Sequence, residues 1–214
     1  MLRTMFRWPS FGGVILAAGE SSRMGTDKAL LPWPPQPADR PPSNETFLTA
    51  AIRSLEFSTD FIVVVAGANA SIISPLVYAT AASVVTNPDP SRGQFSSLQI
   101  GLNEVLNRGR DAAIITLVDR PPARRATIEK LRTAFANAES GIWAVVPEYG
   151  GQHGHPYVIG RELMTIFLEA SATANARDIE HTHQEHMQYV PVDDPFVAMN
   201  VNTPEDYAEL AAKV

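Results

Sequence analysis

Cysteine is absent from this chain of 214 residues. The protein therefore forms no disulfide, no zinc site with thiolate ligands and no cysteine-ligated iron–sulfur cluster. This absence fits a reducing compartment, and we expect a cytoplasmic protein. Long hydrophobic runs are also absent from the sequence, since no apolar stretch approaches the roughly 18 residues that predict a membrane-spanning helix. We therefore expect no membrane partner.

Basic residues are scarce relative to acidic ones: 17 Lys and Arg stand against 23 Asp and Glu, for a formal net charge of −6. A protein that binds nucleic acid needs a basic face for the phosphate backbone, so we expect no nucleic-acid partner. A small anionic ligand can still bind in a local basic pocket. The length suits one α/β domain. We expect a flexible N-terminal extension over residues 1–12 and one domain over residues 13–214.

Apolar segments and amphipathic segments alternate along the chain. The apolar segments predict mostly buried strands at residues 13–18, 61–66, 83–86, 112–118, 143–147 and 189–192. Helical spacing and capping residues predict helices at residues 46–57, 72–79, 96–108, 126–138, 161–170, 176–186 and 203–213. This alternation is typical of a mostly parallel sheet with helices on both faces. The proline-rich segment 33–44 is predicted to be an extended loop, either a surface insertion or a lid.

Three polar loops follow predicted strands, at residues 19–28, 87–97 and 119–122. Because ligands bind beyond the carboxyl ends of the strands in such sheets, we expect the three loops to converge on one site. The first loop belongs to the run VILAAGESSRMGTDK, which ends at Lys28 and also contains Arg23. Backbone N–H groups of a Gly- and Ser-rich turn bind phosphate, and these two cations supply countercharge. The run lacks both the Walker P-loop pattern and the dinucleotide fingerprint.

This run resembles L-A-A-G-x-S-x-R-M-G-x-x-K, the signature loop of the MobA-like or MocA-like nucleotidyltransferases. The resemblance implies a Rossmann-like three-layer α/β/α fold of the nucleotide-diphospho-sugar transferase type. It also implies catalytic roles for Arg23 and Lys28. The residues that it implies for nucleotide binding are Leu16, Ala17, Ala18, Gly19, Ser21, Ser22, Gly25, Ser97 and Leu98. The L-A-A-G form is closer to the cytidylyl branch than to the guanylyl branch, whose loop usually reads L-A-G-G, so CTP is the expected donor.

Two segments carry candidate ligands for a magnesium ion. Asp119 ends a predicted strand, where its carboxylate can hold Mg²⁺ or cap the next helix. Its context resembles the family's D-Q-P, with Arg120 in place of glutamine. The run NVNTPEDY resembles the family's D-I-D-T-P-E-D-Y, but Asn200 and Asn202 replace both leading aspartates. The resemblance implies that Asp119 and Asn200 bind Mg²⁺, and the lost negative charge leaves weak or absent activity as an alternative.

Two further segments resemble family motifs. Residues 149–156, YGGQHGHP, resemble Y-x-G-x-x-G-H-P beside the acceptor substrate, which implies that Gly154 and His155 bind the acceptor. Residues 90–101 resemble G-M-x-x-S-L-x-x-G, which contacts the base and sugar; Ser96 and Ser97 are expected to open a helix there. The three histidines between residues 181 and 186 favour a solvated helix face.

The resemblance implies that an acceptor phosphate attacks the α-phosphorus of a nucleoside triphosphate and releases pyrophosphate. The expected partners are CTP and molybdopterin, and the expected cofactor is Mg²⁺. A sugar phosphate or another small phosphate remains an alternative acceptor. The asparagines at positions 200 and 202 leave a second alternative from another class, a nucleotide-binding relative without catalysis.

Overall fold

The computed structural model describes residues 7–36 and 40–213, which fold around one mixed sheet. Within these residues the strands are β1 Phe11–Ala17, β2 Phe61–Ala66, β3 Ser83–Thr86, β4 Ala112–Leu117, β5 Ala144–Tyr149, β6 Gln152–His153, β7 Tyr157–Gly160 and β8 Met187–Pro191. The α-helices are α1 Phe47–Glu56, α2 Ala70–Tyr78, α3 Gln94–Asn107, α4 Arg125–Ala136, α5 Arg161–Glu169, α6 Ala176–Thr182 and α7 Pro204–Ala211. Short 3₁₀ turns lie at Lys28–Leu30, Pro90–Arg92, Gln184–His186 and Pro195–Ala198.

One half of the sheet is parallel, in the order β3-β2-β1-β4. Its central strand, β1, is buried along its whole length, which explains why its sequence shows no alternation of apolar and polar residues. Val14 in β1 lies opposite Val63 in β2 and Ile115 in β4. This half positions the carboxyl ends of β1 and β4 side by side.

The other half contains β7, which is antiparallel to both of its neighbours, β4 and β5. Strand β8 pairs with β5 in parallel, and the two-residue β6 folds back on the end of β5. The sequence did not predict β6 or β7: β6 has only two residues, and β7 is a short apolar run whose antiparallel pairing with β4 and β5 is a tertiary feature. The insertion of β7 makes the sheet mixed, although most of its pairings are parallel.

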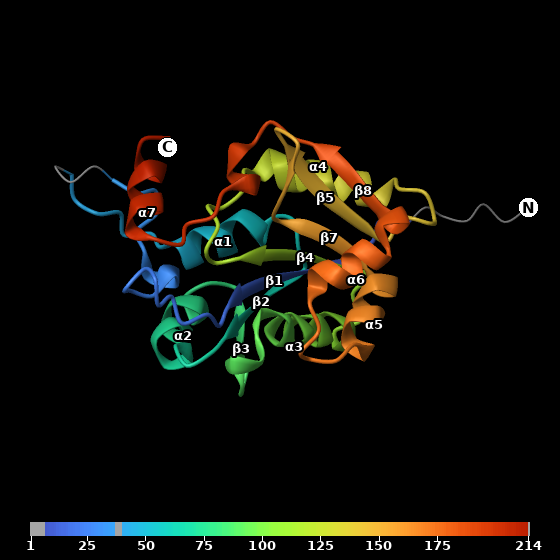
Figure 1. The fold of residues 1–214 in the computed structure, drawn as a ribbon, viewed down its shortest axis with the longest axis horizontal. Coiled ribbons are helices and arrows are strands. Elements are labelled where there is room, and N and C mark those ends of the chain that lie inside the picture. The colour runs from blue at the N-terminus through green and yellow to red at the C-terminus, as the bar shows by residue number, and fades with distance from the viewer. Residues whose placement is uncertain (1–6, 37–39, 214) are drawn as a thin grey trace, which may run out of the picture.

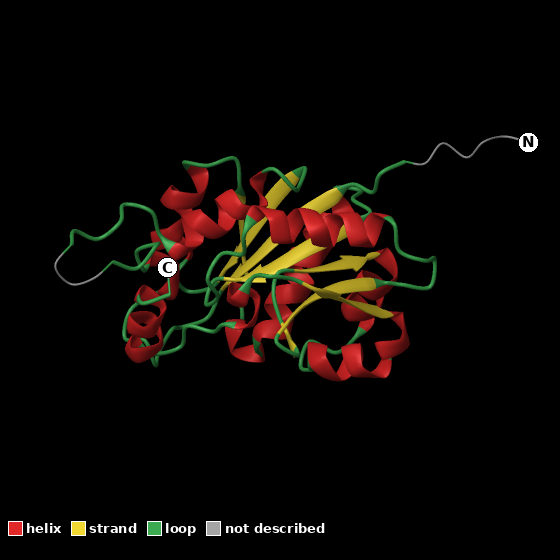
Figure 2. Cartoon of the chain, turned by 90° about the horizontal axis from the view of Figure 1, so that it is seen from above, coloured by secondary structure: helices red, strands yellow, loops and turns green. Residues whose placement is uncertain are grey.

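Helices cover both faces of the sheet, as Figures 1 and 2 show, and the three-layer prediction is confirmed. On one face Ile15 of β1 packs in a cluster with Leu55 of α1 and Ile128 of α4. On the other face Val14 packs in a cluster with Leu102 of α3. Within residues 7–36 and 40–213, no helix has the length and apolar character needed to cross a bilayer.

The bounds of several elements differ from the sequence prediction. Strand β1 begins at Phe11 rather than at residue 13, because Phe11 pairs with Ala112 of β4 and is buried. Ser10 is also tied down, since its N–H and hydroxyl both donate to Asp111 Oδ2, at 2.8 and 2.7 Å. Residues 1–6 of the expected extension lie outside the described residues. The helix expected over residues 176–186 ends at Thr182, because His183 leaves helical geometry.

The proline-rich segment is anchored where it is described. Trp33 packs edge-on against Phe47 and Phe196, with ring centroids 5.2 and 5.8 Å apart, and its N–H donates to the carbonyl of Glu45 at 2.7 Å. Residues 37–39 of the expected loop lie outside the described residues. The base of the segment therefore packs beside α1.

Candidate active site

The loop after β1 has a folded core of its own. Ser21 has a positive φ of 52°, and its carbonyl accepts hydrogen bonds from Met24 N–H at 2.9 Å and Gly25 N–H at 3.2 Å. Gly25 also has a positive φ, 74°, a conformation that glycine adopts without strain. The Ser21 hydroxyl accepts from Lys28 N–H at 3.1 Å. These contacts set where Lys28 begins its short 3₁₀ turn.

Asp27 and Asn69 stabilise this loop, and neither was among the residues predicted for the site. Asp27 caps the turn by accepting from Ala29 N–H at 2.9 Å, and its second oxygen accepts from Asn69 Nδ2 at 2.7 Å. Asn69 also donates to the carbonyl of Ala17 at 3.0 Å. Polar residues directly after β1 and β2 were the available signal, because the ends of neighbouring parallel strands share one edge of the sheet.

Lys28 is the buried cation of the site, with only 8% of its surface exposed. Its Nζ donates to Asn202 Oδ1 at 2.9 Å and lies 3.6 Å from Asp119 Oδ2. The exposed Arg23 donates to the same Asn202 oxygen at 3.3 Å. A buried ammonium requires such partners, since an unpaired charge in the interior is very costly. The structure thus joins the loop after β1, the end of β4 and the segment before α7.

The segment before α7 is held in place by its own cap. The Asp206 carboxylate accepts from the N–H groups of Asn202 and Thr203, at 2.8 and 3.0 Å. In turn, the Thr203 hydroxyl accepts from Asp206 N–H at 3.2 Å. Hydrogen bonds from these N–H groups keep the pKa of the Asp206 carboxyl below its usual value. Thr203 is the N-cap of α7, and this cap holds the segment in which the Asn202 side chain contacts Lys28.

The residues expected to bind a metal lie next to each other. The N–H of Val201 donates to the carbonyl of Asp119 at 2.8 Å, which brings Asn200 to the end of β4. Asp119 Oδ1 is buried and has no hydrogen-bond partner among the described residues. Asn200 is exposed. Asp119 offers this buried carboxylate oxygen, and Asn200 carries an amide oxygen on the adjacent segment; both are ligand types that suit a hard divalent cation, so the residues present fit Mg²⁺.

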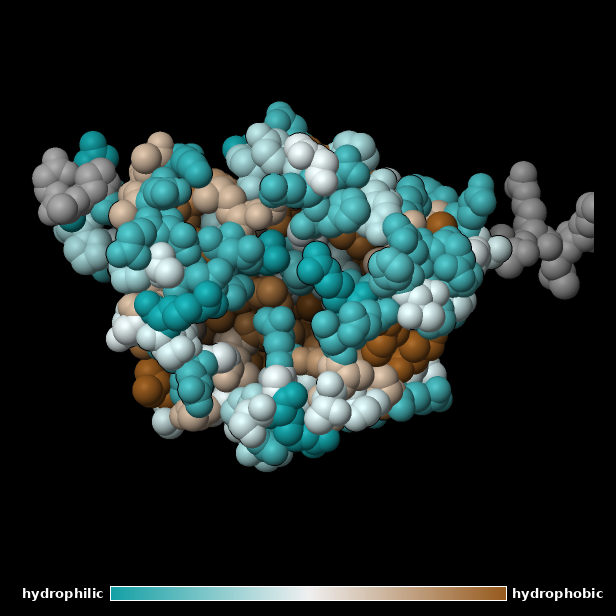
Figure 3. All heavy atoms as spheres, in the orientation of Figure 1, coloured by the Kyte–Doolittle hydropathy of each residue, from teal (hydrophilic) through white to brown (hydrophobic). Residues whose placement is uncertain are grey.

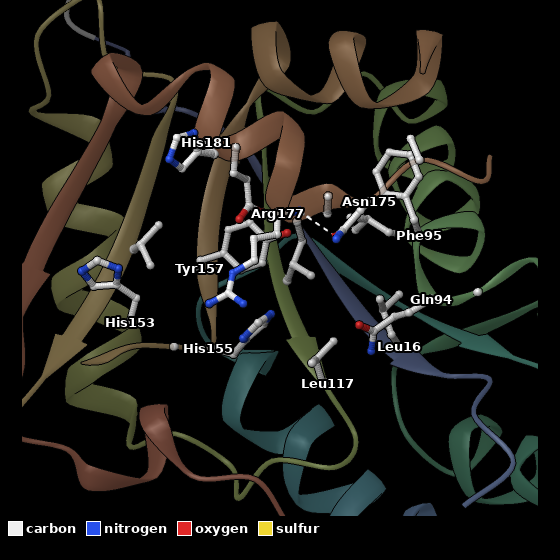
Figure 4. Close-up of a pocket in the computed structure, with 18 of the residues that line it drawn as sticks. Leu16, Gln94, Phe95, Leu117, His153, His155, Tyr157, Asn175, Arg177 and His181 are labelled. Atoms are coloured by element: carbon white, nitrogen blue, oxygen red, sulfur yellow. Dashed lines mark hydrogen bonds between the residues drawn. The ribbon is translucent and has the colours of Figure 1, made fainter. Parts of the chain in front are cut away.

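A cavity of about 880 Å³ opens beside this cluster, and Figure 3 shows it as a hollow with an apolar floor and a hydrophilic rim. Leu16 and Leu117, at the ends of β1 and β4, line one side (Figure 4). Residues 92–95 and Leu98, from the turn and start of α3, line the same side, while residues 153–155, Tyr157 and the α6 region line the other.

The predicted nucleotide-binding residues other than Ser21 and Gly25, which are described above, fall into four groups. Leu16 and Leu98 line the cavity, whereas Ala17 and Ala18 are buried beside it at the end of β1. Gly19 and Ser22 are exposed on the loop. Ser97 is buried away from the cavity wall. The expectation that Ser96 and Ser97 open the helix is wrong: α3 begins at Gln94, and both hydroxyls accept from Asn87 Nδ2 at 2.9 Å.

Gly154 and His155 lie on the far side of the cavity, against residue 197. A Cβ on Gly154 would lie 1.7 Å from the carbonyl oxygen of Val197, so only glycine fits there. That carbonyl also accepts from His155 N–H and from Arg120 Nη1, both at 3.0 Å. Burial, together with the smaller effect of the Arg120 charge, lowers the pKa of His155 to about 3. His155 is therefore a neutral imidazole at physiological pH.

The other histidines are not part of a metal site with His155. His153 stacks on Tyr189, with ring centroids 3.9 Å apart, and points away from His155 in Figure 4. His183, Glu185 and His186 have ligand atoms within 4.8 Å of one another, in a partly exposed group outside the cavity wall. Trp143 stacks on His186 with ring centroids 3.5 Å apart. The prediction of one helix face carrying the three histidines is wrong, because α6 ends at Thr182: His181 lies in α6, whereas His183 and His186 lie beyond it.

Comparison with known proteins identifies the family to which this fold and these motifs belong. The MobA-like NTP transferase domain matches residues 13–198. The molybdenum cofactor cytidylyltransferase of Escherichia coli K12 is 23% identical over 91% of this chain and 92% of its own. The molybdenum cofactor guanylyltransferase of Xanthomonas euvesicatoria pv. vesicatoria is 29% identical, over 92% and 93%.

Among solved structures, the crystal structure of Rv0371c from Mycobacterium tuberculosis H37Rv is similar to this fold, with a TM-score of 0.79 and 25% identity over 96% of this chain and 99% of that one. A complex of that protein with manganese has a TM-score of 0.75 and 22% identity, over 96% and 100%. The fold is therefore shared along almost the whole length of these chains.

Proposed function

Since the chain belongs to the MobA-like NTP transferase family and is a nucleotidyltransferase, we propose that CTP is its donor and molybdopterin its acceptor. The observation that carries the proposal is the meeting of Lys28, Asn202 and Asp119 beside the cavity. The order of these residues matches the signature loop, the strand-end aspartate and the segment before the last helix. The L-A-A-G form of the loop and the cytidylyltransferase relative favour CTP.

In the proposed reaction, an oxygen of the acceptor phosphate forms a bond to the α-phosphorus of the nucleotide. The bond from that phosphorus to the oxygen bridging it to the β-phosphate breaks, and pyrophosphate leaves. The attacking phosphate is already an anion, so the enzyme needs no general base. Catalysis rests on positioning and on stabilising negative charge. Lys28 is the buried cation for that charge, and Arg23 adds a second at the mouth of the loop.

Asp119 and Asn200 would hold the metal ion. The buried, unpartnered Oδ1 of Asp119 is the anionic ligand, and Asn200 offers a neutral oxygen from the adjacent segment. A bound Mg²⁺ would neutralise phosphate charge that the two cations leave uncompensated. The manganese complex of the structurally similar mycobacterial protein supports a divalent ion in this fold.

GTP is a second candidate donor. The guanylyltransferase relative is 29% identical to this chain, against 23% for the cytidylyltransferase, over similar lengths. A sugar phosphate is a second candidate acceptor. A nucleotide-binding protein without catalytic activity is the alternative from another class, because Asn200 and Asn202 remove two negative charges from the family motif.

The experiment is pyrophosphate release measured with CTP, GTP, ATP and UTP in turn, with Mg²⁺ or Mn²⁺, in the presence and absence of molybdopterin. Turnover that requires molybdopterin and is fastest with CTP is the expected result. Preference for GTP would overturn the choice of base and keep the reaction. Nucleotide binding without turnover on molybdopterin or a sugar phosphate would overturn the catalytic proposal.

A further inference from the structure

The cavity wall carries an uneven distribution of charge. Among the described residues that line it, Arg92, Arg120 and Arg177 are cationic, and three histidines, His153, His181 and the neutral His155, lie with them. Glu180, on α6, is the single acidic side chain among the described residues that line the cavity. The basic side chains suit a phosphorylated acceptor. A single carboxylate in their midst needs a different explanation, because it repels the same phosphate.

Glu180 faces the floor of the cavity. Its side chain is half-buried and lies near the hydroxyl of Tyr157, a residue that is only 5% exposed. Burial raises the pKa of Glu180 to about 7, and the opposing influences of Arg177 and Tyr157 are smaller. A carboxylate accepts hydrogen bonds at two oxygens, so one neighbouring hydroxyl does not use its whole capacity. Glu180 thus keeps the capacity to accept further hydrogen bonds from the cavity.

Three side chains define a direction across the cavity. His155 lies edge-on to Tyr157, with ring centroids 5.0 Å apart, and the Tyr157 hydroxyl lies near Glu180. Figure 4 shows His155 and Tyr157 neighbouring each other, with Arg177 and His181 of α6 on the same side of the view. His155 shares the Val197 carbonyl with Arg120, which follows Asp119. The row therefore runs from the reacting end of the site to Glu180.

We propose that Glu180 recognises the heterocyclic ring of the acceptor by accepting hydrogen bonds from two adjacent N–H donors, such as the ring N–H and 2-amino group of a 2-amino-4-oxopteridine. The inference rests on the proposed function, since it assigns the phosphate of that acceptor to the reacting end of the row. A carboxylate matches such a donor pair with two parallel hydrogen bonds. A site built to bind a donor strongly rejects an analogue that lacks it.

The test uses a matched pair of fluorescent ligands: a pterin with a phosphorylated side chain, and the corresponding lumazine, in which an oxygen replaces the 2-amino group. Affinities are measured by fluorescence titration of the full chain without nucleotide. We expect the wild type to bind the pterin about tenfold or more tightly than the lumazine. E180Q should bind the pterin about tenfold more weakly and lose the preference, because an amide offers one acceptor and one donor group.

Glu185→Gln is the matched control, since Glu185 has the same chemistry and a 68% exposed side chain three residues beyond α6. It should leave both affinities unchanged. Equal wild-type affinities for the two ligands would overturn the inference, and this result needs no variant to fold. Unchanged pterin binding by folded E180Q would also overturn it.

The two proposals fail in different ways. If pterin binding depends on Glu180 but no nucleotidyl transfer is found, the reaction fails and the ring recognition stands. If molybdopterin is turned over and E180Q leaves its KM unchanged, the reaction stands and the role of Glu180 fails.

Discussion

Asn202 positions Lys28 from 174 residues away in the sequence, through a 2.9 Å hydrogen bond from the ammonium to the amide oxygen. Asn202 is a neutral partner, so it orients the ammonium without cancelling its charge. An aspartate at this position would form an ion pair with Lys28 instead. The asparagine therefore leaves the positive charge of Lys28 and Arg23 available to a triphosphate.

Replacing this amide with a carboxylate should weaken substrate binding. We expect N202D to lower kcat/KM for the nucleotide by about tenfold or more, because the new charge repels the triphosphate and neutralises Lys28. Asn103→Asp, on the exposed side of α3, is the control for added negative charge and should have little effect. Steady-state pyrophosphate release at low and high salt would test this. Activity of N202D equal to that of wild type would show that the amide has no such role.

Removing the buried cation should have a larger effect. K28A should lower kcat/KM by about 10² to 10³, the range seen when one donor to developing negative charge is lost. Lys130→Ala removes an exposed lysine on α4 and should retain full activity. Activity of K28A within twofold of wild type would contradict the role of Lys28. Thermal unfolding of both variants would separate loss of fold from loss of function.

Gly154 should tolerate no side chain. In G154A the methyl group would overlap the Val197 carbonyl, so residues 195–198 must shift, and we expect a loss of about 2 kcal/mol in the free energy of unfolding. The same shift should raise the KM for the acceptor, because that carbonyl holds His155 and Arg120. Gly141→Ala meets nothing within 4 Å and is the control. Urea unfolding and acceptor kinetics would test the two effects; equal stability of both variants would contradict the first.

Glu180 makes stability depend on pH. Its pKa is about 7 in the folded protein and near 4.5 when unfolded, so between these values the folded state binds the proton more strongly. The resulting stabilisation is fully present below pH 4.5 and is lost as the pH rises through 7. It amounts to about 3 kcal/mol at most. Urea unfolding at pH 5 to 8 should show the wild type losing stability relative to E180Q, while E185Q follows the wild type. If the free energies of unfolding of wild type and E180Q change in parallel with pH, Glu180 does not cause the pH dependence.

The sequence predicted the parallel half of the sheet because those strands are continuous apolar runs, as in β1 and β4. It could not predict the position of β7, since four residues after a proline have no periodicity and their pairing with β4 and β5 is a tertiary feature. The burial of Phe11 has the same origin, because its partner Ala112 lies 101 residues later.

The site was predictable where polar residues follow a strand. The expected meeting of Lys28 with Asp119 is present at 3.6 Å. The roles of Asn202 and Glu180 were not predictable in this way. The sequence pattern marks Asn202 by its missing negative charge and gives no sign that it contacts Lys28. Glu180 lies in a predicted helix, and which side of that helix faces the cavity depends on how α6 packs.

The antiparallel strand β7 lies between two parts of the sheet that contribute different residues to the site. The loops after β1 and β4, on one side of it, hold the Lys28 cluster, to which we assign the phosphates. The segment from residue 173 to residue 189, on the other side, contributes cavity wall but none of the Lys28 cluster. Substitutions confined to that segment should therefore change the choice of acceptor and leave the proposed transfer chemistry unchanged.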